Sequence, residues 1–523
     1  MKLHHLKPLR VTVSLVFFLL IALLFLDFQN TGIRSIAGEL LYLQFVPSLL
    51  KFINGAVLGA TGFIMVLLIT LLLGRVYCAT VCPFGTFQDL MGRLTRKKKQ
   101  KRHRYSYSRP HNILRYTLFS LTVLLFLTGS GLLLNLIDPF SSFGRILSNL
   151  IRPLTIGMNN LMVPLVESLG GHALYRVQWQ VVAPVSVGVS LAWLFLVGWM
   201  GARHGRLYCN TICPVGALLG CFSKFSWFKI CIAPEACKGC KQCEGVCKAG
   251  CINLQEMTID VSRCVSCYNC LVACPEQALS FENGWQRRTR RDLQGSGRRE
   301  FMLGLVLGSV GMINDAAGQP NELIQSRPTT IPEKRTCPIS PPGSVSVAQF
   351  TATCTACHLC VSVCPSRVLV PSFLKYGLSG FMQPQMDFQA GHCNYECTAC
   401  MDVCPSGAIL TLQDGRKQTT QIGVAQFIKG NCVVYTDKTN CGACSEHCPT
   451  KAVHMVPYLN AAGRKLVIPE VNPDICIGCG GCEHACPTRP YRAIYVDGNP
   501  VHKIAQKPVT KKIKEDAAED FPF

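Results

Sequence analysis

The residues with the clearest capacity for chemistry are the cysteines, of which the 523-residue chain contains 32. Eight of them form two runs in the middle of the chain, each with the spacing C-x2-C-x2-C-x3-C. In paired [4Fe-4S] sites, three close thiolates hold one cluster and the fourth thiolate of that run holds the other cluster. We therefore predict one cluster on Cys237, Cys240, Cys243 and Cys274, and a second on Cys264, Cys267, Cys270 and Cys247.

Four more runs of four cysteines occupy the C-terminal part of the chain, so the sequence provides ligands for six [4Fe-4S] clusters in all. The second and third of these runs have a wider first gap. The intervals between the runs are nearly equal, so adjacent pairing and nested pairing of the runs both fit. The four runs are Cys354, Cys357, Cys360 and Cys364; Cys393, Cys397, Cys400 and Cys404; Cys432, Cys441, Cys444 and Cys448; and Cys476, Cys479, Cys482 and Cys486.

Three other uses of these cysteines compete with iron–sulfur ligation. Structural zinc takes one four-ligand set with a longer central gap, and disulfides suit small secreted proteins. Tight runs that mostly end in Cys-Pro favour clusters over both. Residues 354–358 also match C-x-x-C-H, the attachment pattern of c-type haem. Because Cys360 and Cys364 continue the cluster spacing without a break, we predict a cluster there as well.

Four further cysteines belong to an internal repeat of about ten residues. One chemistry for the repeat is an extra cluster, another is a different metal, and a third is a redox dithiol pair; packing cysteines are the plain alternative. We predict that Cys78, Cys82, Cys209 and Cys213 form one cofactor site at a cytoplasmic membrane surface, with Tyr77 and Tyr208 beside it. The copies read Gly74-Arg75-Val76-Tyr77-Cys78-x3-Cys82-Pro83-x-Gly85 and Gly205-Arg206-Leu207-Tyr208-Cys209-x3-Cys213-Pro214-x-Gly216.

The elements that must carry these residues begin with apolar segments. The chain is 49% hydrophobic with a mean hydropathy of +0.26, and four long uncharged runs precede the first cysteine cluster motif. Runs of about 20 apolar residues suit a transmembrane helix. The first run follows a basic start but no small-residue cleavage site, so we expect a retained helix and not a signal peptide. The runs are Val11–Leu26, Phe52–Gly74, Tyr116–Ile137 and Val177–Gly201.

The basic residues predict the orientation of these helices, because cytoplasmic loops are enriched in Lys and Arg. The net charge of +22 lies almost entirely in residues 1–313, beside hydrophobic segments, which argues against a nucleic-acid-binding surface. The loop after the second run is the most basic, so we expect it, the N-terminus and residues 226–285 on the cytoplasmic side. That loop contains Arg96, Lys97, Lys98, Lys99, Lys101, Arg102 and Arg104.

A second basic segment separates the two cysteine-rich regions. Arg298 and Arg299 precede an apolar stretch that ends at Ile313, which resembles a twin-arginine export signal placed inside the chain. The stretch is shorter than the roughly 20 residues that a membrane-spanning helix needs. We expect it to act as a short fifth anchor and to place residues 314–523 in the periplasm; a cytoplasmic linker is the alternative.

Taken together, these motifs resemble known families. Four membrane helices, two G-R-x-Y-C-x3-C-P motifs and a two-cluster ferredoxin are similar to NapH, and also to the membrane modules of NosR and MauN. The arginine pair and the last four runs resemble the polyferredoxins NapG and MauM. The resemblance implies a fusion of two usually separate subunits that feed a periplasmic reductase, with quinol as donor. One departure is that the first ferredoxin run ends Cys247-Lys248 instead of Cys-Pro.

The expected fold is therefore a membrane α-helical domain with four transmembrane helices and a short fifth, followed by α+β ferredoxin-like iron–sulfur domains. The expected domains are a membrane domain over 1–225, a cytoplasmic two-cluster ferredoxin over 226–285, a basic linker with the export-like segment over 286–318, a linker over 319–350, a four-cluster polyferredoxin over 351–498 and a tail over 499–523.

The predicted function is electron transfer in the bacterial inner membrane, from a quinol pool through six [4Fe-4S] clusters to a periplasmic reductase or cytochrome. The alternatives are a redox factor that reduces copper during oxidase assembly, and a cluster-bearing scaffold without electron flow. No glycine-rich phosphate motif accompanies a strand and helix, so a nucleotide cofactor is not expected. The sequence assigns no role to Cys221, Cys231, Cys251 and Cys337.

Overall fold

The computed structural model describes residues 5–28, 32–54, 61–95, 105–171, 174–179, 183–283, 331–412, 415–459 and 465–507. Three predictions lie outside these residues. They are the basic loop at 96–104, the segment 286–318 with its export-like motif, and the first part of the linker expected at 319–350.

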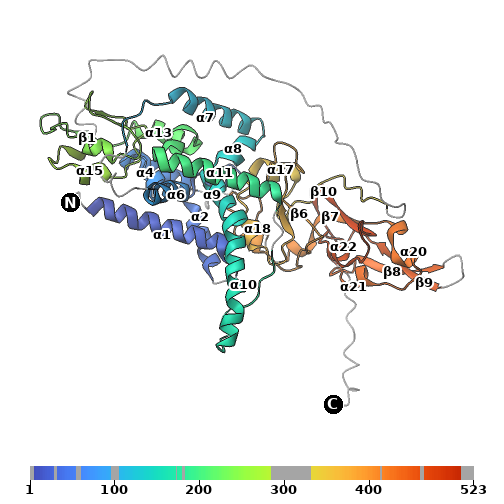
Figure 1. The fold of residues 1–523 in the computed structure, drawn as a ribbon. Coiled ribbons are helices and arrows are strands. Elements are labelled where there is room, and N and C mark those ends of the chain that lie inside the picture. The colour runs from blue at the N-terminus through green and yellow to red at the C-terminus, as the bar shows by residue number, and fades with distance from the viewer. Residues whose placement is uncertain are drawn as a thin grey trace.

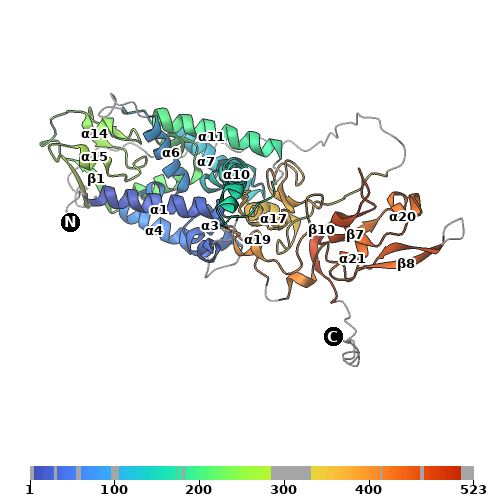
Figure 2. The same ribbon diagram turned by 60° about the horizontal axis from the view of Figure 1, so that its bottom comes forward.

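Three parts follow one another along the molecule. A helical bundle lies in the middle, with a small iron–sulfur domain at one end and a larger one at the other (Figures 1 and 2). The elements of the bundle are α1 (Leu6–Leu26), η2 (Ile33–Ile36), α2 (Ala37–Tyr42), α3 (Phe45–Ile53), α4 (Gly62–Leu73), α5 (Tyr77–Thr80), α6 (Pro83–Leu94), α7 (Asn112–Leu127), α8 (Leu132–Ile137), α9 (Pro139–Ile146), η4 (Leu147–Ile151), α10 (Arg152–Ser168), α11 (Pro184–His204), α12 (Leu207–Thr211) and α13 (Pro214–Ser223).

The bundle helices differ in length from the four uncharged runs. Among the described residues, α1 and α11 are long and apolar enough to cross a membrane, and α2 with α3 would add a third span if that pair, bent by 81°, is one crossing. The second run is divided, because α3 ends at Ile53 and α4 has only 12 residues. The third run breaks after α7, where Gly129 adopts φ 83° and ends the helix.

One segment of the bundle is buried although it connects two of the apolar runs. Every residue of α9 is buried, and the π-helical η4 continues it directly. Asp138 starts α9 by accepting a hydrogen bond from the backbone N–H of Ser141 at 2.8 Å. The segment therefore forms an inner wall of the bundle and not an exposed loop.

The smaller iron–sulfur domain is built from two similar halves. Strand β1 (Phe228–Ile232) pairs antiparallel with β4 (Leu279–Asn283), which closes the domain on itself. Between them lie α14 (Gln242–Gly245), β2 (Ile252–Asn253), β3 (Thr258–Ile259) and α15 (Asn269–Ala273).

The larger domain extends beyond the predicted limits of 351–498. Gly498 packs against the backbone of Cys337 and Pro338, and β10 continues to residue 504, so residues 331–350 and 499–507 belong to the domain. The antiparallel pairs are β5 with β6, β7 with β10, and β8 with β9. Its elements are α17 (Val347–Thr353), α18 (Leu359–Val363), β5 (Leu369–Pro371), β6 (Pro384–Met386), α19 (Ala399–Asp402), η6 (Lys417–Thr419), β7 (Thr420–Phe427), η7 (Lys429–Asn431), α20 (Val433–Thr436), α21 (Ala443–Glu446), β8 (Val453–Leu459), β9 (Lys465–Val471), α22 (Gly481–Ala485) and β10 (Ile494–Ile504).

The hydrophobic core of the bundle reaches both iron–sulfur domains. A single cluster of buried side chains contains Cys267 of the smaller domain and Cys357 of the larger one, together with the four cysteines of the repeat. A predicted ligand from each domain is thus in contact with the same apolar interior.

Candidate iron–sulfur sites

The outer site of the smaller domain has the ligands that the spacing predicts. Cys237, Cys240, Cys243 and Cys274 line a recess that contains about 360 Å³ of empty space, part of it open to solvent. Cys240 is exposed, so this site lies near the solvent. Four thiols around one cavity suit a [4Fe-4S] cluster, which needs more room than a single ion.

The inner site of this domain brings together the other predicted set. Burial raises the pKa of the Cys270 thiol, and the neighbouring charges of Cys267, Cys264 and Cys247 raise it further. Cys267 belongs to the bundle core, so the inner site faces the helices. This arrangement agrees with the predicted exchange of the fourth cysteine between the two runs, and the ligand assignment stays a prediction.

In the larger domain the structure decides between adjacent and nested pairing. A cavity of about 340 Å³ is lined by Cys432, Cys441 and Cys444 of the third run and by Cys486 of the fourth. The reciprocal thiol, Cys448, is among the charges that raise the pKa of the buried Cys482 after desolvation by burial. The third and fourth runs therefore share their sites.

The first two runs are paired in the same way. Burial raises the pKa of Cys360, and the charges that add to this effect include Cys404 of the second run. Burial also raises the pKa of Cys400, and the largest further contributions come from the charges of Cys393 and then of Cys364 in the first run. Adjacent pairing thus holds throughout. The four candidate ligand sets are Cys354, Cys357, Cys360 and Cys404; Cys393, Cys397, Cys400 and Cys364; Cys432, Cys441, Cys444 and Cys486; and Cys476, Cys479, Cys482 and Cys448.

Pairing also sets the order of the sites along the domain. The first site touches the bundle, because Cys357 lies in its core. The second site adjoins the fourth run, where the backbone N–H of Cys393 donates to the carbonyl of Cys479 at 2.9 Å. The contacts therefore lead from the bundle to the first site, then to the second site, then to the site on the fourth run. The site on the third run comes last.

Local backbone geometry explains the tight spacing. In the C-x2-C-x2-C runs the residue after the second cysteine has a left-handed backbone, with φ 56° at Lys241, 58° at Tyr268, 64° at His358 and 77° at Gly480. Each of these residues immediately precedes a short helix that carries the third cysteine. The resulting bend wraps three thiols around one space. His358 belongs to this bend, and its buried ring contacts the carbonyl of Met382 at 2.8 Å, which does not fit a haem ligand.

The four cysteines of the repeat converge inside the bundle. Cys78 lies in α5 and Cys209 in α12, whereas Cys82 and Cys213 precede the prolines that begin α6 and α13. The predicted helix start at Cys-Pro is confirmed. All four thiols are 5% exposed or less. In the described part of the chain, no three Cys, His, Asp or Glu side chains approach as the ligands of one bare metal ion would.

The two copies are locked together by their arginines. Arg75 donates to the carbonyl of Cys209 at 3.0 Å, and Arg206 donates to the carbonyl of Cys78 at 2.6 Å. A Cβ atom on Gly216 would lie 2.9 Å from the Arg75 guanidinium, and one on Gly85 would lie 2.3 Å from that of Arg206. The glycine of each C-P-x-G motif is therefore needed to admit the arginine of the other copy.

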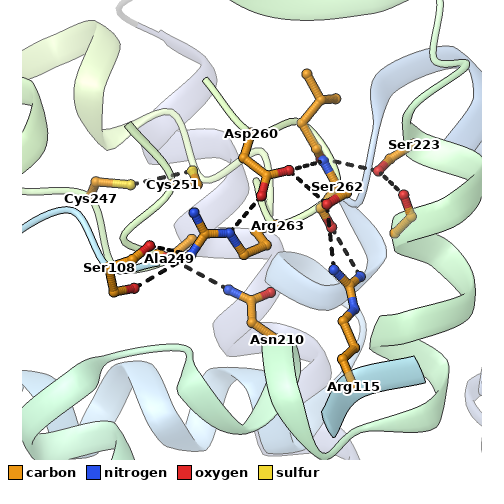
Figure 3. A network of polar contacts seen from close by, with 12 residues as sticks. Ser108, Arg115, Asn210, Ser223, Cys247, Ala249, Cys251, Asp260, Ser262 and Arg263 are labelled. Atoms are coloured by element: carbon orange, nitrogen blue, oxygen red, sulfur yellow. Dashed lines mark hydrogen bonds and ion pairs between the residues drawn. The ribbon is translucent and has the colours of Figure 1, made fainter. Parts of the chain in front are cut away.

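The smaller domain sits on this crossed arrangement. Arg75 donates to the carbonyl of Ser262 at 2.9 Å. Arg115 donates to the same carbonyl at 3.1 Å (Figure 3). On the other side, the ammonium of Lys248 lies 3.0 Å from a carboxylate oxygen of Asp89 in α6. Asp89 also pairs with Arg206. The lysine that replaces the usual proline after Cys247 thus attaches the domain to the bundle, a role that the sequence did not reveal.

The larger domain docks at the opposite end of α1, against α9. Arg145 donates to the carbonyls of Asn135 at 2.6 Å and Ala356 at 3.3 Å. A Cβ atom on Gly144 would lie 2.6 Å from the carbonyl oxygen of Cys357, so the two backbones are in close contact. Views from two directions place this domain and the smaller one at opposite ends of the helices (Figures 1 and 2).

Cys251 is a further residue that sequence reasoning left without a role. Its sulfur lies 3.6 Å from that of Cys247 (Figure 3), and Cys264 is its second thiol neighbour. The second run carries Ala278 at the same distance from its last cysteine, and Ala278 lines the outer cavity. The signal that could have found Cys251 is this internal comparison of the runs.

Comparison with known protein families supports the iron–sulfur assignment in every cysteine region. A model described as a 4Fe-4S binding domain matches both copies of the repeat, at residues 56–102 and 185–230. A 4Fe-4S dicluster domain matches residues 353–408 and 439–489, which agrees with adjacent pairing. Two further 4Fe-4S binding domain models match residues 257–279 and 234–250.

Individual relatives cover different parts of the chain. An uncharacterized protein of Methanocaldococcus jannaschii is 27% identical over 50% of this chain and 86% of its own length. The ferredoxin-type protein NapG of Escherichia coli is 28% identical over 35% of this chain and 78% of its own. The methylamine utilization ferredoxin-type protein MauM of Methylorubrum extorquens is 31% identical over 27% and 64%. No solved structure matches.

These relatives confirm the resemblance to NapG and MauM for the polyferredoxin, whereas the resemblance of the membrane module to NapH stays a prediction. The chain is an iron–sulfur electron-transfer protein, with several [4Fe-4S] sites, that is related to the ferredoxin-type Nap and Mau proteins.

Proposed function

We propose that this protein relays single electrons across the bacterial inner membrane, between a cytoplasmic two-cluster domain and a periplasmic four-cluster domain. When bound, each [4Fe-4S] cluster accepts and releases one electron at a potential that its surroundings tune. The observation that carries the proposal is the shared core, in which Cys267 at one end and Cys357 at the other contact the same buried interior.

The side chains of the bundle support this role by excluding water between the two ends. Phe25 and Phe143 are almost fully buried near the larger domain, and Phe84 and Tyr208 near the repeat. The apolar spans α1 and α11 run between the two iron–sulfur domains (Figure 2). A dry, ordered interior keeps solvent reorganisation small during electron transfer, which favours passage through the protein over leakage to water.

The proposed orientation of the chain in the membrane rests on the basic residues of one loop. The run of basic residues at 96–104 precedes residues that hold the smaller domain, since the backbone N–H of Tyr105 donates to the carbonyl of Gly245 at 3.1 Å. Basic loops favour the cytoplasmic side, which supports a cytoplasmic two-cluster domain. Quinol as the donor, and a periplasmic reductase or cytochrome as the acceptor, are proposed from the relation to the Nap and Mau proteins.

Two measurements test the proposal. Two reporters are fused separately after residue 523. The alkaline phosphatase fusion should be active, and the fusion to a fluorescent protein that matures only in the cytoplasm should be dark. The full chain, reconstituted anaerobically in liposomes with a reduced impermeant dye inside, should reduce an impermeant oxidant outside. A cytoplasmic C-terminus would contradict the transmembrane arrangement. If protein that contains all its clusters reduces the external oxidant no faster than protein-free liposomes do, the relay is contradicted.

A further inference from the structure

We propose that Cys78, Cys82, Cys209 and Cys213 together hold one additional [4Fe-4S] cluster inside the bundle, shared between the two copies of the repeat. The family match describes each copy as similar to a 4Fe-4S binding domain but does not say that the copies share a site. The binding site stands on its own geometry, whereas its role as an intermediate station rests on the proposed relay.

The four thiols are arranged alike in the two copies of the repeat. Each copy contributes one cysteine from a short helix and one that immediately precedes the first turn of the next helix. The backbone N–H of Gly216 donates to the sulfur of Cys213 at 3.3 Å. Gln88 donates to the sulfur of Cys209 at 3.2 Å. Donors aimed at sulfur stabilise thiolates and are a general means of tuning iron–sulfur clusters.

The positive charge of the buried arginines beside the four thiols is not fully compensated. Arg75 and Arg206 are fully buried, and the Nε atom of Arg75 and one terminal nitrogen of Arg206 have no hydrogen-bond partner among the described atoms. Asp89 is shared by Arg206, Arg10 and Lys248. One carboxylate thus faces three cations, and no carboxylate is recorded in a salt bridge with Arg75 in the described structure.

A buried charge without compensation is costly. Protonated thiols or two disulfides would be neutral. Arg75 would then have no recorded counter-charge among the described residues, and Arg206 would have only its share of Asp89. Four thiolates around a [4Fe-4S]²⁺ core carry a net charge of about −2, which is the sign that the arginines require. The charge argument therefore favours an anionic metal–thiolate centre over packing cysteines.

The four thiols also have contacts that lead toward both iron–sulfur domains. Toward the smaller domain, Arg75 donates to the carbonyl of Ser262, close to the inner ligand Cys264, and its guanidinium lies 3.9 Å from the sulfur of Cys78. Toward the larger domain, the hydroxyl of Tyr208 donates to the carbonyl of Ile137 at 2.6 Å. The four thiols therefore lie between the two domains that the relay must connect.

The contacts continue from Ile137 to the first site of the larger domain. Arg145 bonds to the carbonyls of Asn135 and Ala356, and Ala356 is the neighbour of the ligand Cys357. In the proposed step one electron leaves the inner cluster of one domain and one electron enters the first cluster of the other. No bond forms or breaks, and the additional centre returns to its starting state.

The test compares iron contents of the anaerobically purified full chain. The wild type should contain about 28 iron atoms per chain, and a Cys82→Ser, Cys213→Ser variant about 24. Serine is a favourable residue before a helix, so α6 and α13 should still begin at the same positions. Cys221→Ser is the matched control, because Cys221 lies in α13 outside the motif and should leave the content unchanged.

A second variant guards against misfolding. Gln88→Leu removes the donor to the Cys209 sulfur but no ligand, so it should keep the iron content and shift one electron paramagnetic resonance signal. About 24 irons in the wild type would overturn the proposal. So would a Cys78–Cys82 disulfide found by alkylation and mass spectrometry, or stoichiometric copper or zinc.

The failure of this inference is distinguishable from failure of the relay. Iron content does not depend on sidedness or on the donor. About 28 irons without flow across liposomes would keep the site and reject the relay, whereas about 24 irons with flow would do the opposite. If both hold, the Cys82→Ser, Cys213→Ser variant should lower flow to the level of protein-free liposomes.

Discussion

The two iron–sulfur domains use the same cysteine pattern but are attached to the bundle by different forces. Arginine side chains donate to backbone carbonyls at both attachments, Arg75 and Arg115 at the smaller domain and Arg145 at the larger one. The smaller domain adds an ion-pair cluster in which Lys248 and Arg206 meet at Asp89. The larger domain adds close backbone packing at Gly144, and no ion pair is recorded between it and the bundle among the described residues. The charged attachment uses an arginine of the repeat, so the smaller domain and the four-thiol site should be lost together. The packed attachment should be separable from both.

The largest effect should come from Asp89→Asn. This change removes the one carboxylate that compensates three buried cations, and breaking a buried ion pair costs about 3–5 kcal/mol. We expect a lower unfolding midpoint and protease cleavage near residues 226–228, measured by thermal melting and limited proteolysis. Glu276→Gln is the control, because its ion pair with Lys238 is solvent-exposed and should change stability by less than about 1 kcal/mol. Equal effects of the two changes would contradict the charged attachment.

Gly144→Ala should weaken the other attachment by about 1–3 kcal/mol, the usual cost of overpacking. Its Cβ would lie 2.6 Å from both the carbonyl oxygen of Cys357 and the ring of Phe25. Protease protection of the larger domain should fall while the spectra of the smaller domain stay unchanged. Gly198→Ala in α11 is the matched control, since nothing lies within 4 Å of the new atom. Loss of the clusters on 237–274 in Gly144→Ala would show that the two attachments are coupled.

Lys248→Pro sharpens the comparison by restoring the usual Cys-Pro sequence. The ligand Cys247 is kept, whereas the 3.0 Å contact with Asp89 is lost. A hydrogen bond to a charged group contributes about 1.5–3 kcal/mol, and Asp89 keeps two arginines, so we expect a result near the lower value. Chemical denaturation should show weaker docking, with the iron content unchanged. A variant as stable as the wild type would mean that the lysine does not attach the domain.

The smallest effect should come from Cys251→Ala, which should change the reduction potential of the inner cluster and leave the stability of the protein unchanged. Cys251→Ala removes a thiol 3.6 Å from the ligand sulfur of Cys247. Hydrogen bonds to cluster sulfurs raise the potential, so the inner cluster should shift downward by on the order of tens of millivolts in a redox titration followed by electron paramagnetic resonance. Ala278→Cys should shift the outer cluster upward. If neither cluster responds, Cys251 is a packing residue.

Much of each site could be predicted from the sequence because the cysteines of a run lie close together in the chain. The left-handed bends at Lys241, Tyr268 and His358 fold three thiols around one space within a few residues. The exchange of Cys247 and Cys274 was predictable for the same reason, since two runs separated by a short interval have no other partner. The helices were predicted less well, because hydropathy alone did not locate the break at Gly129.

The spacing of the cysteines predicts which residues can hold clusters, since chelation by closely spaced thiols depends on the neighbouring backbone. The folded structure was needed to show which runs share sites in the larger domain, where nearly equal intervals allowed two solutions. It also brought Cys78 beside Cys209, 131 positions later in the chain, and gave Lys248 its partner on α6. These pairings depend on how distant helices pack and how buried charges are compensated, and no short stretch of sequence contains that information.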